Sequence, residues 1–541
     1  MRYSQLLATG LVTAVGLISL SGLSAQSPAQ KTPPAAQAKP SGLQCTAGPV
    51  PDPFKDSLVG DFPNGLLPID QNVKDSIMKS GLPCQEHVRP DVGPEKEGLE
   101  NLQRGFDFYS WRTFIALNSP ADDRISIEQA QPDTRTRWED MDNFKQLLDV
   151  MLPTNMQPPK WPTDQAGMEA ERERLMPEEC RALDKQMPHR MIVKMIEESF
   201  NEPFKTGPLI DQQGHYAIFD ILMNRQMFNY ITDKDHQLYS KAGQMANSGL
   251  VVDFPPGNDH PPGDNPSPTL GAFMLKVSWK ILTPDEIHAR NFHMVDALVL
   301  MPPPDPNLPS NDRQAKRPCL PEKLGLIGFH AVHKTVGRPQ WIWTSFEHVK
   351  NVPDRSEVDA KTFDGPYSFF SISCKGDCPS ENATPPWPWD PDPALQLRFR
   401  RDDSFNSQIV RETPLGHATK NMNKIFQSML PADNVWKNYM LVNTQWPSAF
   451  ACTSLLSLSF DAPLPKNDFL RQPDMTCSPA PTFMANSTLE TYSQGDIPQA
   501  SSSCIGCHGN AVSFQTRPLN PKPGSINFNQ SDFTFILEKA Q

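Results

Sequence analysis

Proline constrains the backbone of this chain more than any other residue type does. The sequence has 57 prolines among its 541 residues, about twice the average share of about 5%. Each proline fixes its own φ angle, lacks an N–H donor and disfavours helical geometry in the residue before it. We therefore expect short helices and strands joined by many extended or turning connections.

The first 25 residues have the organisation of a secretory signal peptide. Arg2 supplies a positive charge, residues 6–20 form a short apolar stretch, and Ala25 is the small residue that signal peptidases prefer. The apolar stretch is too short for a comfortable membrane span, and the cleavage point has no cysteine for a lipid anchor. We predict cleavage near Ala25 and a periplasmic or secreted protein without a stable membrane anchor.

The ten cysteines are compatible with an oxidising compartment. They lie at positions 45, 84, 180, 319, 374, 378, 452, 477, 504 and 507. Eight precede residue 500, an even number that allows up to four disulfides. Eight cysteines allow 105 pairings, so the sequence does not specify the connectivity; Cys374–Cys378 and Cys452–Cys477 are the natural local pairs.

Charge excludes one class of partner. The net charge is −12 and the pI is near 5.5, and no run of Lys or Arg stands out. Nucleic acids favour a basic face, so we predict no nucleic-acid partner. An acidic surface suits a basic redox partner, although it also serves solubility.

Periodicity predicts an α+β fold: a mixed body with an antiparallel sheet, short helices and Pro-rich loops, and a small, mainly helical C-terminal segment. Apolar residues at helical intervals predict helices over residues 106–118, 138–152 and 417–430, and one or two more within 177–200. Short runs rich in β-branched and aromatic residues predict strands over residues 272–282, 291–301, 325–335 and 339–349.

Composition suggests four regions along the chain. After the signal peptide (1–25) we expect a flexible leader and loop-rich entry segment (26–100), with ordered structure from about Gly105. The α+β body would cover residues 101–480. Residues 481–541, which begin with a short helical stretch near 485–494, would form the functional C-terminal segment.

That segment contains the sequence Cys504-Ile505-Gly506-Cys507-His508. Two thiols three positions apart on one helical turn can each form a thioether with one porphyrin vinyl group. The histidine that follows can then bind the haem iron as the proximal ligand. The motif predicts one covalently attached haem c held by Cys504, Cys507 and His508, with His508 as the iron ligand.

Three other roles for the motif fit less well. A thioredoxin-like dithiol would open a βαβ unit, whereas this motif lies close to the end of the chain. A zinc site needs a fourth ligand, and no Cys or His follows His508. A local disulfide has no need of the histidine. Signatures of serine hydrolases, zinc proteases, P-loops and dinucleotide-binding folds do not stand out.

The chain resembles the c-type cytochromes at these five residues. It is also similar to a group of large single-haem cytochrome c-like proteins of Gram-negative bacteria in the stretches HAVHKT (330–335), PQWIWTSFEHV (339–349) and SSSCIGCHGNA (501–511). The small cytochrome c pattern places an axial methionine downstream of the motif, but residues 509–541 contain neither Met nor His. Pro518-Leu519 resembles the family's loop whose proline carbonyl accepts the proximal imidazole N–H.

The second axial position of the iron is therefore open to several candidates. Met484 lies just upstream of the motif, and His330, His333 and His348 lie on or beside predicted strands. Each of them could equally be a residue of the protein core. His330 and His333 are three apart, so on a strand they point to opposite faces and only one of them could face a haem.

The axial ligands decide the function that we expect. An iron bound by protein on both sides is suited to electron transfer with a redox partner protein or a small-molecule donor or acceptor. An open site would suit a haem-dependent oxidoreductase acting on peroxide, oxygen or nitrogen oxides in a cavity formed by the body. The sequence predicts electron transfer first and leaves the enzyme as the alternative. It does not specify a substrate, a catalytic residue or an oligomeric state.

Overall fold

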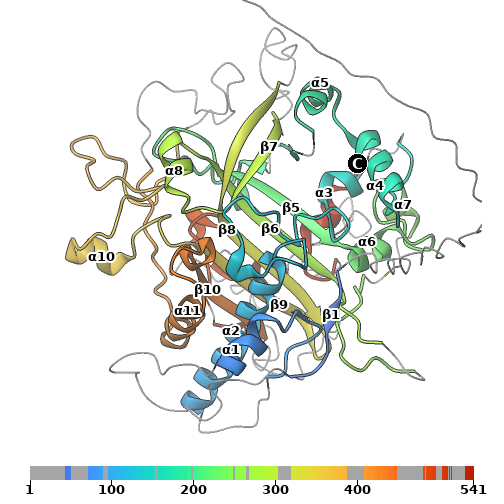
Figure 1. Ribbon diagram of the computed structural model, residues 1–541, viewed down its shortest axis with the longest axis horizontal. Helices are drawn as coiled ribbons and strands as arrows, with labels where there is room; N and C mark the ends of the chain where they lie inside the picture. Colours follow the sequence, from blue (N-terminus) through green and yellow to red (C-terminus); the bar gives the residue numbers. More distant parts are fainter. Residues whose placement is uncertain are drawn as a thin grey trace, which may run out of the picture. The chain divides into compact units, whose positions relative to one another are not determined.

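The fold is α+β, with a nine-stranded, mostly antiparallel sheet at its centre (Figure 1). The computed structural model describes residues 43–49, 71–88, 95–152, 156–188, 190–195, 199–247, 250, 252–263, 267–301, 318–386, 407–447, 479–481, 483–494, 502–509, 511, 513 and 531–541. The signal peptide predicted over residues 1–25 and the predicted pair Cys452–Cys477 lie outside these residues.

The sheet has the strand order β11-β10-β9-β8-β6-β5-β3, and β7 pairs with both β8 and β4. All these pairings are antiparallel except β4 with β7. The strands are β3 (Phe144–Gln146), β4 (Met191–Lys194), β5 (Ile218–Asn224), β6 (Phe273–Ile281), β7 (Met294–Leu300), β8 (Cys319–Thr335), β9 (Arg338–His348), β10 (Tyr439–Pro447) and β11 (Pro479–Ala480). A two-residue parallel pair, β1 (Cys45–Thr46) and β2 (Leu82–Pro83), stands apart from it.

The four strands predicted between residues 272 and 349 are confirmed as β6, β7, β8 and β9. β8 is longer than expected because its first half pairs with β7 and its second half with β9. On its other edge, β6 pairs with residues 324–333 of β8. Gly337, at a positive φ of 78°, lies between β8 and β9 and provides the left-handed residue that such tight connections need.

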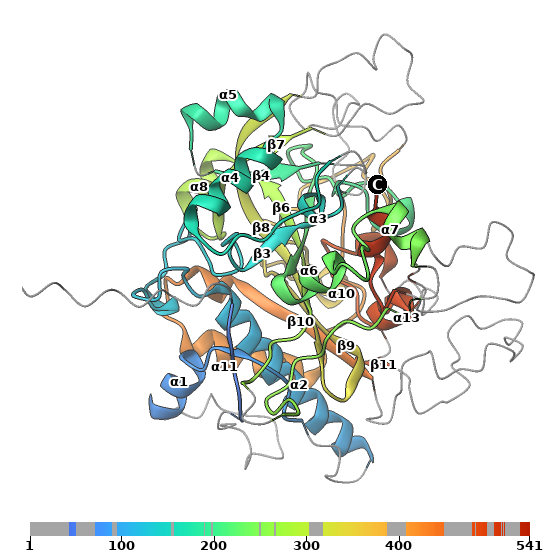
Figure 2. The ribbon, with the colours of Figure 1, turned by 90° about the vertical axis from the view of Figure 1, so that its right-hand side faces the viewer.

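Helices and buried aromatic rings cover one face of the sheet. The predicted helices at residues 106–118 and 417–430 are confirmed as parts of α2 and α11. Trp111 of α2 stacks on Phe426 of α11 with ring centroids 5.0 Å apart, and Phe114 stacks on Phe346 of β9 at 4.1 Å. We call this side of the sheet the helix face (Figure 2). The helices are α1 (Gln71–Met78), α2 (Glu95–Asn118), α3 (Leu147–Val150), α4 (Gln165–Leu175), α5 (Glu178–Gln186), α6 (Arg225–Thr232), α7 (Lys241–Ala246), α8 (Pro284–Ala289), α10 (Arg355–Ala360), α11 (His417–Met429) and α13 (Cys504–His508).

The C-terminal part of the chain packs on the opposite face, which we call the motif face. Along β8 and β9 every second side chain points this way, as the pleat of a strand requires. Val332, Trp343, Ile505 and Phe533 belong to one buried apolar cluster there. Residues 483–494, 502–509 and 531–541 therefore contribute to the same core as the sheet.

One helix prediction is wrong in part. Residues 138–152 contain only the short α3, because Phe144–Gln146 hydrogen-bonds to β5 as strand β3. Pairing with a neighbouring strand overrides the local helical spacing there. Within residues 177–200 the expected helix is confirmed as α5, which ends before Pro188, a residue without an N–H to continue a helix; Met191–Lys194 then forms β4 beside β7.

The entry and C-terminal segments also differ from expectation. The flexible leader predicted at the start of residues 26–100 falls on residues up to 42, which lie outside the described residues, and the entry segment, expected to be loop-rich, includes β1, α1, β2 and the start of α2. Ordered structure thus begins before Gly105. The stretch near 485–494 contains a turn and a short 3-10 helix (Thr491–Ser493) in place of an α-helix.

Three disulfides fasten the described chain. Cys374–Cys378 is the predicted local pair. Cys45–Cys84 and Cys180–Cys319 join residues 39 and 139 positions apart, which sequence spacing alone did not predict. Cys180–Cys319 ties α5 to the start of β8. No helix in the described parts of the chain is long and apolar enough to cross a bilayer.

Replacing Phe114 with Ala tests the core on the helix face. Phe114 is fully buried, so its removal leaves a cavity and should lower the free energy of unfolding by about 3–5 kcal/mol. Guanidinium titration followed by circular dichroism measures the change. Met245→Ala, at a side chain that is 65% exposed, is the control and should change stability by less than about 0.5 kcal/mol. Equal losses in the two variants would contradict this description of the core.

Candidate functional site

The Cys504–His508 motif lies on one short helical turn, α13, as the sequence predicts. The side chain of Ser503 caps the turn by accepting a hydrogen bond from the N–H of Gly506 at 3.1 Å. Gln445 of β10 accepts a hydrogen bond from the N–H of Ile505 at 2.8 Å. Ile505 itself is 2% exposed, so the turn is anchored to the motif face by one side chain and one amide.

Cys504 and Cys507 remain thiols, whereas the other described cysteines are joined in disulfides. Burial raises the pKa of Cys504 well above its ordinary value and that of Cys507 to about 12. Dithiol oxidoreductases and zinc sites use thiolates, and this environment disfavours thiolates. Among the residues that the structure describes, no group of three or more His, Cys, Asp or Glu side chains could hold a metal ion.

The backbone carbonyl of Phe533 fixes the orientation of His508. Nδ1–H of His508 donates to this carbonyl at 3.0 Å. Burial lowers the pKa of His508 to about 4, so the imidazole is neutral and its Nε2 carries the lone pair. The ring lies between Trp343 and Phe535, with centroid distances of 4.3 and 5.0 Å. The acceptor among the described residues is thus the Phe533 carbonyl; the predicted Pro518-Leu519 loop lies outside the described residues.

The chain holds the Phe533 carbonyl in an uncommon backbone conformation. Asp532 and Phe533 have positive φ angles of 51° and 60°, a region that side chains other than glycine rarely adopt. The Asp532 carboxylate accepts hydrogen bonds from the Phe254 N–H at 2.7 Å and the Trp341 indole N–H at 3.3 Å, and it also pairs with buried Lys334. These contacts tie the strained turn to the sheet.

The positions and hydrogen bonds of His333 and His348 exclude both as a second axial iron ligand opposite His508. Both lie on the helix face. Nδ1 of His333 accepts from the Tyr109 hydroxyl at 2.5 Å and its Nε2–H donates to the Leu270 carbonyl. Nε2–H of His348 donates to Asn291 and its Nδ1 accepts from the Lys350 N–H, both at 3.1 Å. Neither ring has a nitrogen left for a metal.

His330 lies on the motif face, so the structure places His330 and His333 on opposite faces, as their spacing predicts. Nε2–H of His330 donates to the two carboxylate oxygens of Glu490 at 2.8 and 3.0 Å. Lys276, the cross-strand neighbour of His330 on β6, has its ammonium group 3.9 Å from Glu490. Burial opposes ionisation of Glu490, yet His330 and Lys276 lower its pKa to about 2. Glu490 is therefore a carboxylate.

Met484 lies in the same buried cluster as Ile505 and Val332 and is 2% exposed. Its backbone N–H donates to Ser502 at 2.6 Å, beside the motif. A space-filling core residue would look the same, so its role as an iron ligand stays a prediction.

Sequence reasoning missed Glu490, Gln445 and Phe533. Glu490 had a weak signal, since it and Asp496 are the charged residues between positions 475 and 507. Gln445 and Phe533 gave no signal in the sequence. Gln445 comes from a distant strand, and Phe533 acts through its backbone carbonyl, which any residue has.

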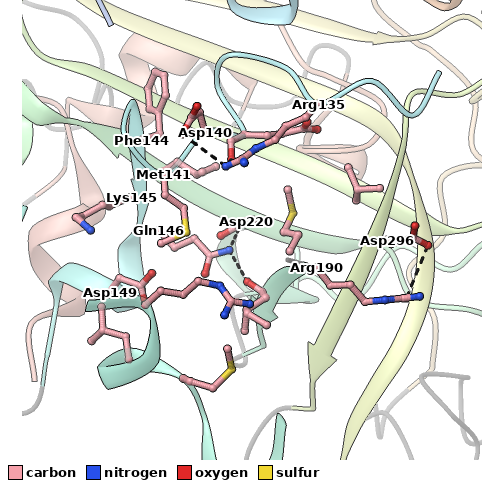
Figure 3. Close-up of a pocket in the computed structure, with 18 of the residues that line it drawn as sticks. Arg135, Asp140, Met141, Phe144, Lys145, Gln146, Asp149, Arg190, Asp220 and Asp296 are labelled. Atoms are coloured by element: carbon pink, nitrogen blue, oxygen red, sulfur yellow. Dashed lines mark hydrogen bonds and ion pairs between the residues drawn. The ribbon is translucent and has the colours of Figure 1, made fainter. Parts of the chain in front are cut away.

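A pocket of about 670 Å³ lies toward the β3 end of the sheet (Figure 3). Gln146 donates to Asp220 there at 2.9 Å, and burial together with Asp149 raises the pKa of Asp220 to about 7. Figure 3 also shows the ion pairs of Arg135 with Asp140 and Arg190 with Asp296. None of Cys504, Cys507 and His508 lines this pocket, so it is not a cavity over a haem held by the motif.

Comparisons with family models, with curated proteins and with solved structures returned no match to this chain. The resemblance to c-type cytochromes therefore depends on the motif and its neighbouring stretches.

Glu202 provides a pH-dependent test of the polar cluster beside the motif. It is buried and accepts hydrogen bonds from the N–H and the hydroxyl of Thr491 at 3.2 and 2.9 Å. Burial raises its pKa from 4.5 to about 7, although Lys276 opposes the shift. The folded protein thus holds this proton more tightly than the unfolded chain. Stability should fall as pH rises from about 4.5 to about 7, by about 3 kcal/mol for this group.

The Glu202→Gln side chain stays neutral at every pH, so this variant should lack the loss of stability that Glu202 causes as pH rises. Guanidinium unfolding at pH 5 and pH 8 measures it. The exposed Glu179→Gln on α5 is the control and should keep the full decline. A Glu202→Gln protein with the wild-type pH dependence would show that Glu202 is not protonated in the folded state.

Proposed function

We propose that this protein is an exported electron carrier with one haem c attached to Cys504 and Cys507, and with His508 as the proximal iron ligand. A haem c supplies an iron that changes reversibly between two oxidation states at a potential set by its ligands and surroundings. The enzyme alternative would need a cavity over the iron, and the pocket of about 670 Å³ lies elsewhere.

The observation that carries the proposal is the combined arrangement of the two thiols and the imidazole. Cys504 and Cys507 are three apart on one capped helical turn and remain thiols. Nδ1 of His508 is held by the Phe533 carbonyl, and no hydrogen bond to its Nε2 is found among the described residues. Metal-bound histidines characteristically have their second nitrogen held in this way.

The surrounding residues give this chain's own contribution to electron transfer. Trp343 and Phe535 pack against the His508 ring. The anchored turn of Asp532 and Phe533 keeps the imidazole in one orientation. A rigid site reduces the rearrangement that accompanies each change of iron charge.

Export is part of the proposal. The signal-like residues 1–25 would direct the chain to the periplasm or the exterior. The three described disulfides support an oxidising compartment. The partner would be a redox protein or a small-molecule electron donor or acceptor. The net charge of −12 favours a basic docking surface on a protein partner.

Exported, purified protein should show a Soret band and carry the added mass of one haem on the peptide that contains residues 504–508. Cys504→Ala together with Cys507→Ala should abolish both signals, because no thioether can form. Absorption spectroscopy and peptide mass spectrometry measure them. Cys374→Ala with Cys378→Ala is the matched control: it removes two cysteines outside the motif and should leave the haem in place. A colourless wild-type protein from a host that attaches haem would refute the proposal.

A further inference from the structure

We infer that His330 is the second axial ligand of the haem iron, opposite His508, and that Glu490 positions its imidazole. This inference rests on the proposed function, since it assumes a haem attached to the motif. It assigns the ligand that the sequence left open among four candidates, and it adds a positioning residue that no motif contains.

The pairing of β8 with β9 brings His330 close to the motif. Val332 of β8 pairs with Trp343 of β9, and Trp343 touches the His508 ring at 4.3 Å. His330 lies two residues from Val332 on the same face, which makes it a diagonal neighbour of Trp343. Diagonal neighbours on paired strands are about 7–8 Å apart. His330 is thus a neighbour of Trp343, and Trp343 packs against the ring of His508.

The segment that carries Glu490 supports this placement. Glu490, which accepts from His330, and Met484 belong to the same stretch, residues 483–494. The Met484 N–H donates to Ser502 at 2.6 Å, beside the motif. The partner of His330 is therefore on a stretch that is hydrogen-bonded to the motif segment.

The hydrogen bonds of the His330 ring match those of a metal-binding histidine. Its Nε2–H donates to Glu490, and no hydrogen bond to its Nδ1 is found in the described part of the chain. His508 has the same pattern, with Nδ1 held by Phe533. A carboxylate behind a metal-bound histidine fixes the ring and makes the metal-binding nitrogen more basic, and either ring nitrogen can bind a metal.

The charges around His330 suit this role as well. The Lys276 ammonium lies 3.9 Å from Glu490 and donates to the carbonyl of Leu489 at 3.2 Å, so it compensates the charge of this partly buried carboxylate. The N–H of Asn486 also donates to Glu490 at 3.1 Å. Glu490 is therefore fixed in place and does not depend on the His330 bond for its orientation.

The wild-type holoprotein provides the first test without any substitution. Two imidazole ligands should give a low-spin spectrum that carbon monoxide does not change at once, and a near-infrared magnetic circular dichroism band typical of bis-histidine iron. The midpoint potential should be lower than that of a Met–His pair. A ferric spectrum with the red absorption band of a methionine sulfur ligand, or a high-spin spectrum, would overturn the inference.

Variants then identify the residue. His330→Gly should convert the iron to high spin and allow prompt carbon monoxide binding, and added imidazole should restore the low-spin spectrum. The restoration separates a lost ligand from a damaged fold. Met484→Leu removes the rival ligand, and His288→Gly removes an exposed histidine; both should keep the wild-type spectrum. A high-spin Met484→Leu protein or a low-spin His330→Gly protein without imidazole would exclude His330.

Glu490→Gln tests the positioning role. The iron should remain low-spin, but the midpoint potential should rise, because a neutral amide makes the His330 imidazole less basic and the oxidised iron less stable. An unchanged potential would leave Glu490 without this role. Absence of haem from the wild-type protein would defeat the proposed function, whereas a haem-containing protein with other ligands would defeat this inference alone.

Discussion

The register of strand β8 between β6 and β9 determines which side chains reach the motif. In that register His330 pairs with Lys276 on one side and Ser345 on the other, and Val332 pairs with Trp343. A shift by one residue would turn every side chain of the strand to the other face. His330 would then exchange places with its neighbours on the helix face. The apolar cores on both faces fix the register, because each face buries its own set of aromatic residues.

The same sheet holds the carbonyl that orients His508. Lys334, two residues beyond Val332 on the motif face, pairs with Asp532, which also accepts from Trp341 and Phe254. Two consecutive left-handed residues cost about 1–3 kcal/mol each when nothing supports them. The buried ion pair and the two hydrogen bonds offset that cost. The turn can therefore present the Phe533 carbonyl to the imidazole although its backbone is unfavourable.

The sequence predicted the parts of the fold that local patterns encode. The strands around residues 272–349 and the helices at 106–118 and 417–430 have strong periodicity, and the structure confirms them. Residues 138–152 were misassigned because pairing of Phe144–Gln146 with β5 is a long-range interaction. The motif is recognisable by its spacing, and the structure confirms that it forms one helical turn; its haem attachment stays a prediction. Glu490 and the Phe533 carbonyl were not recognisable, since their roles arise from contacts across 160 and 25 residues.

The long body has a physical role in this arrangement. Strand β10 provides Gln445 for the motif amide, β9 provides Trp343 for the imidazole, and β8 provides Lys334 for the strained turn. The C-terminal segment takes these groups from strands up to about 200 residues away in the sequence. The orientation of His508 in the folded protein therefore depends on the whole sheet, and the sheet in turn depends on the helices that bury its other face.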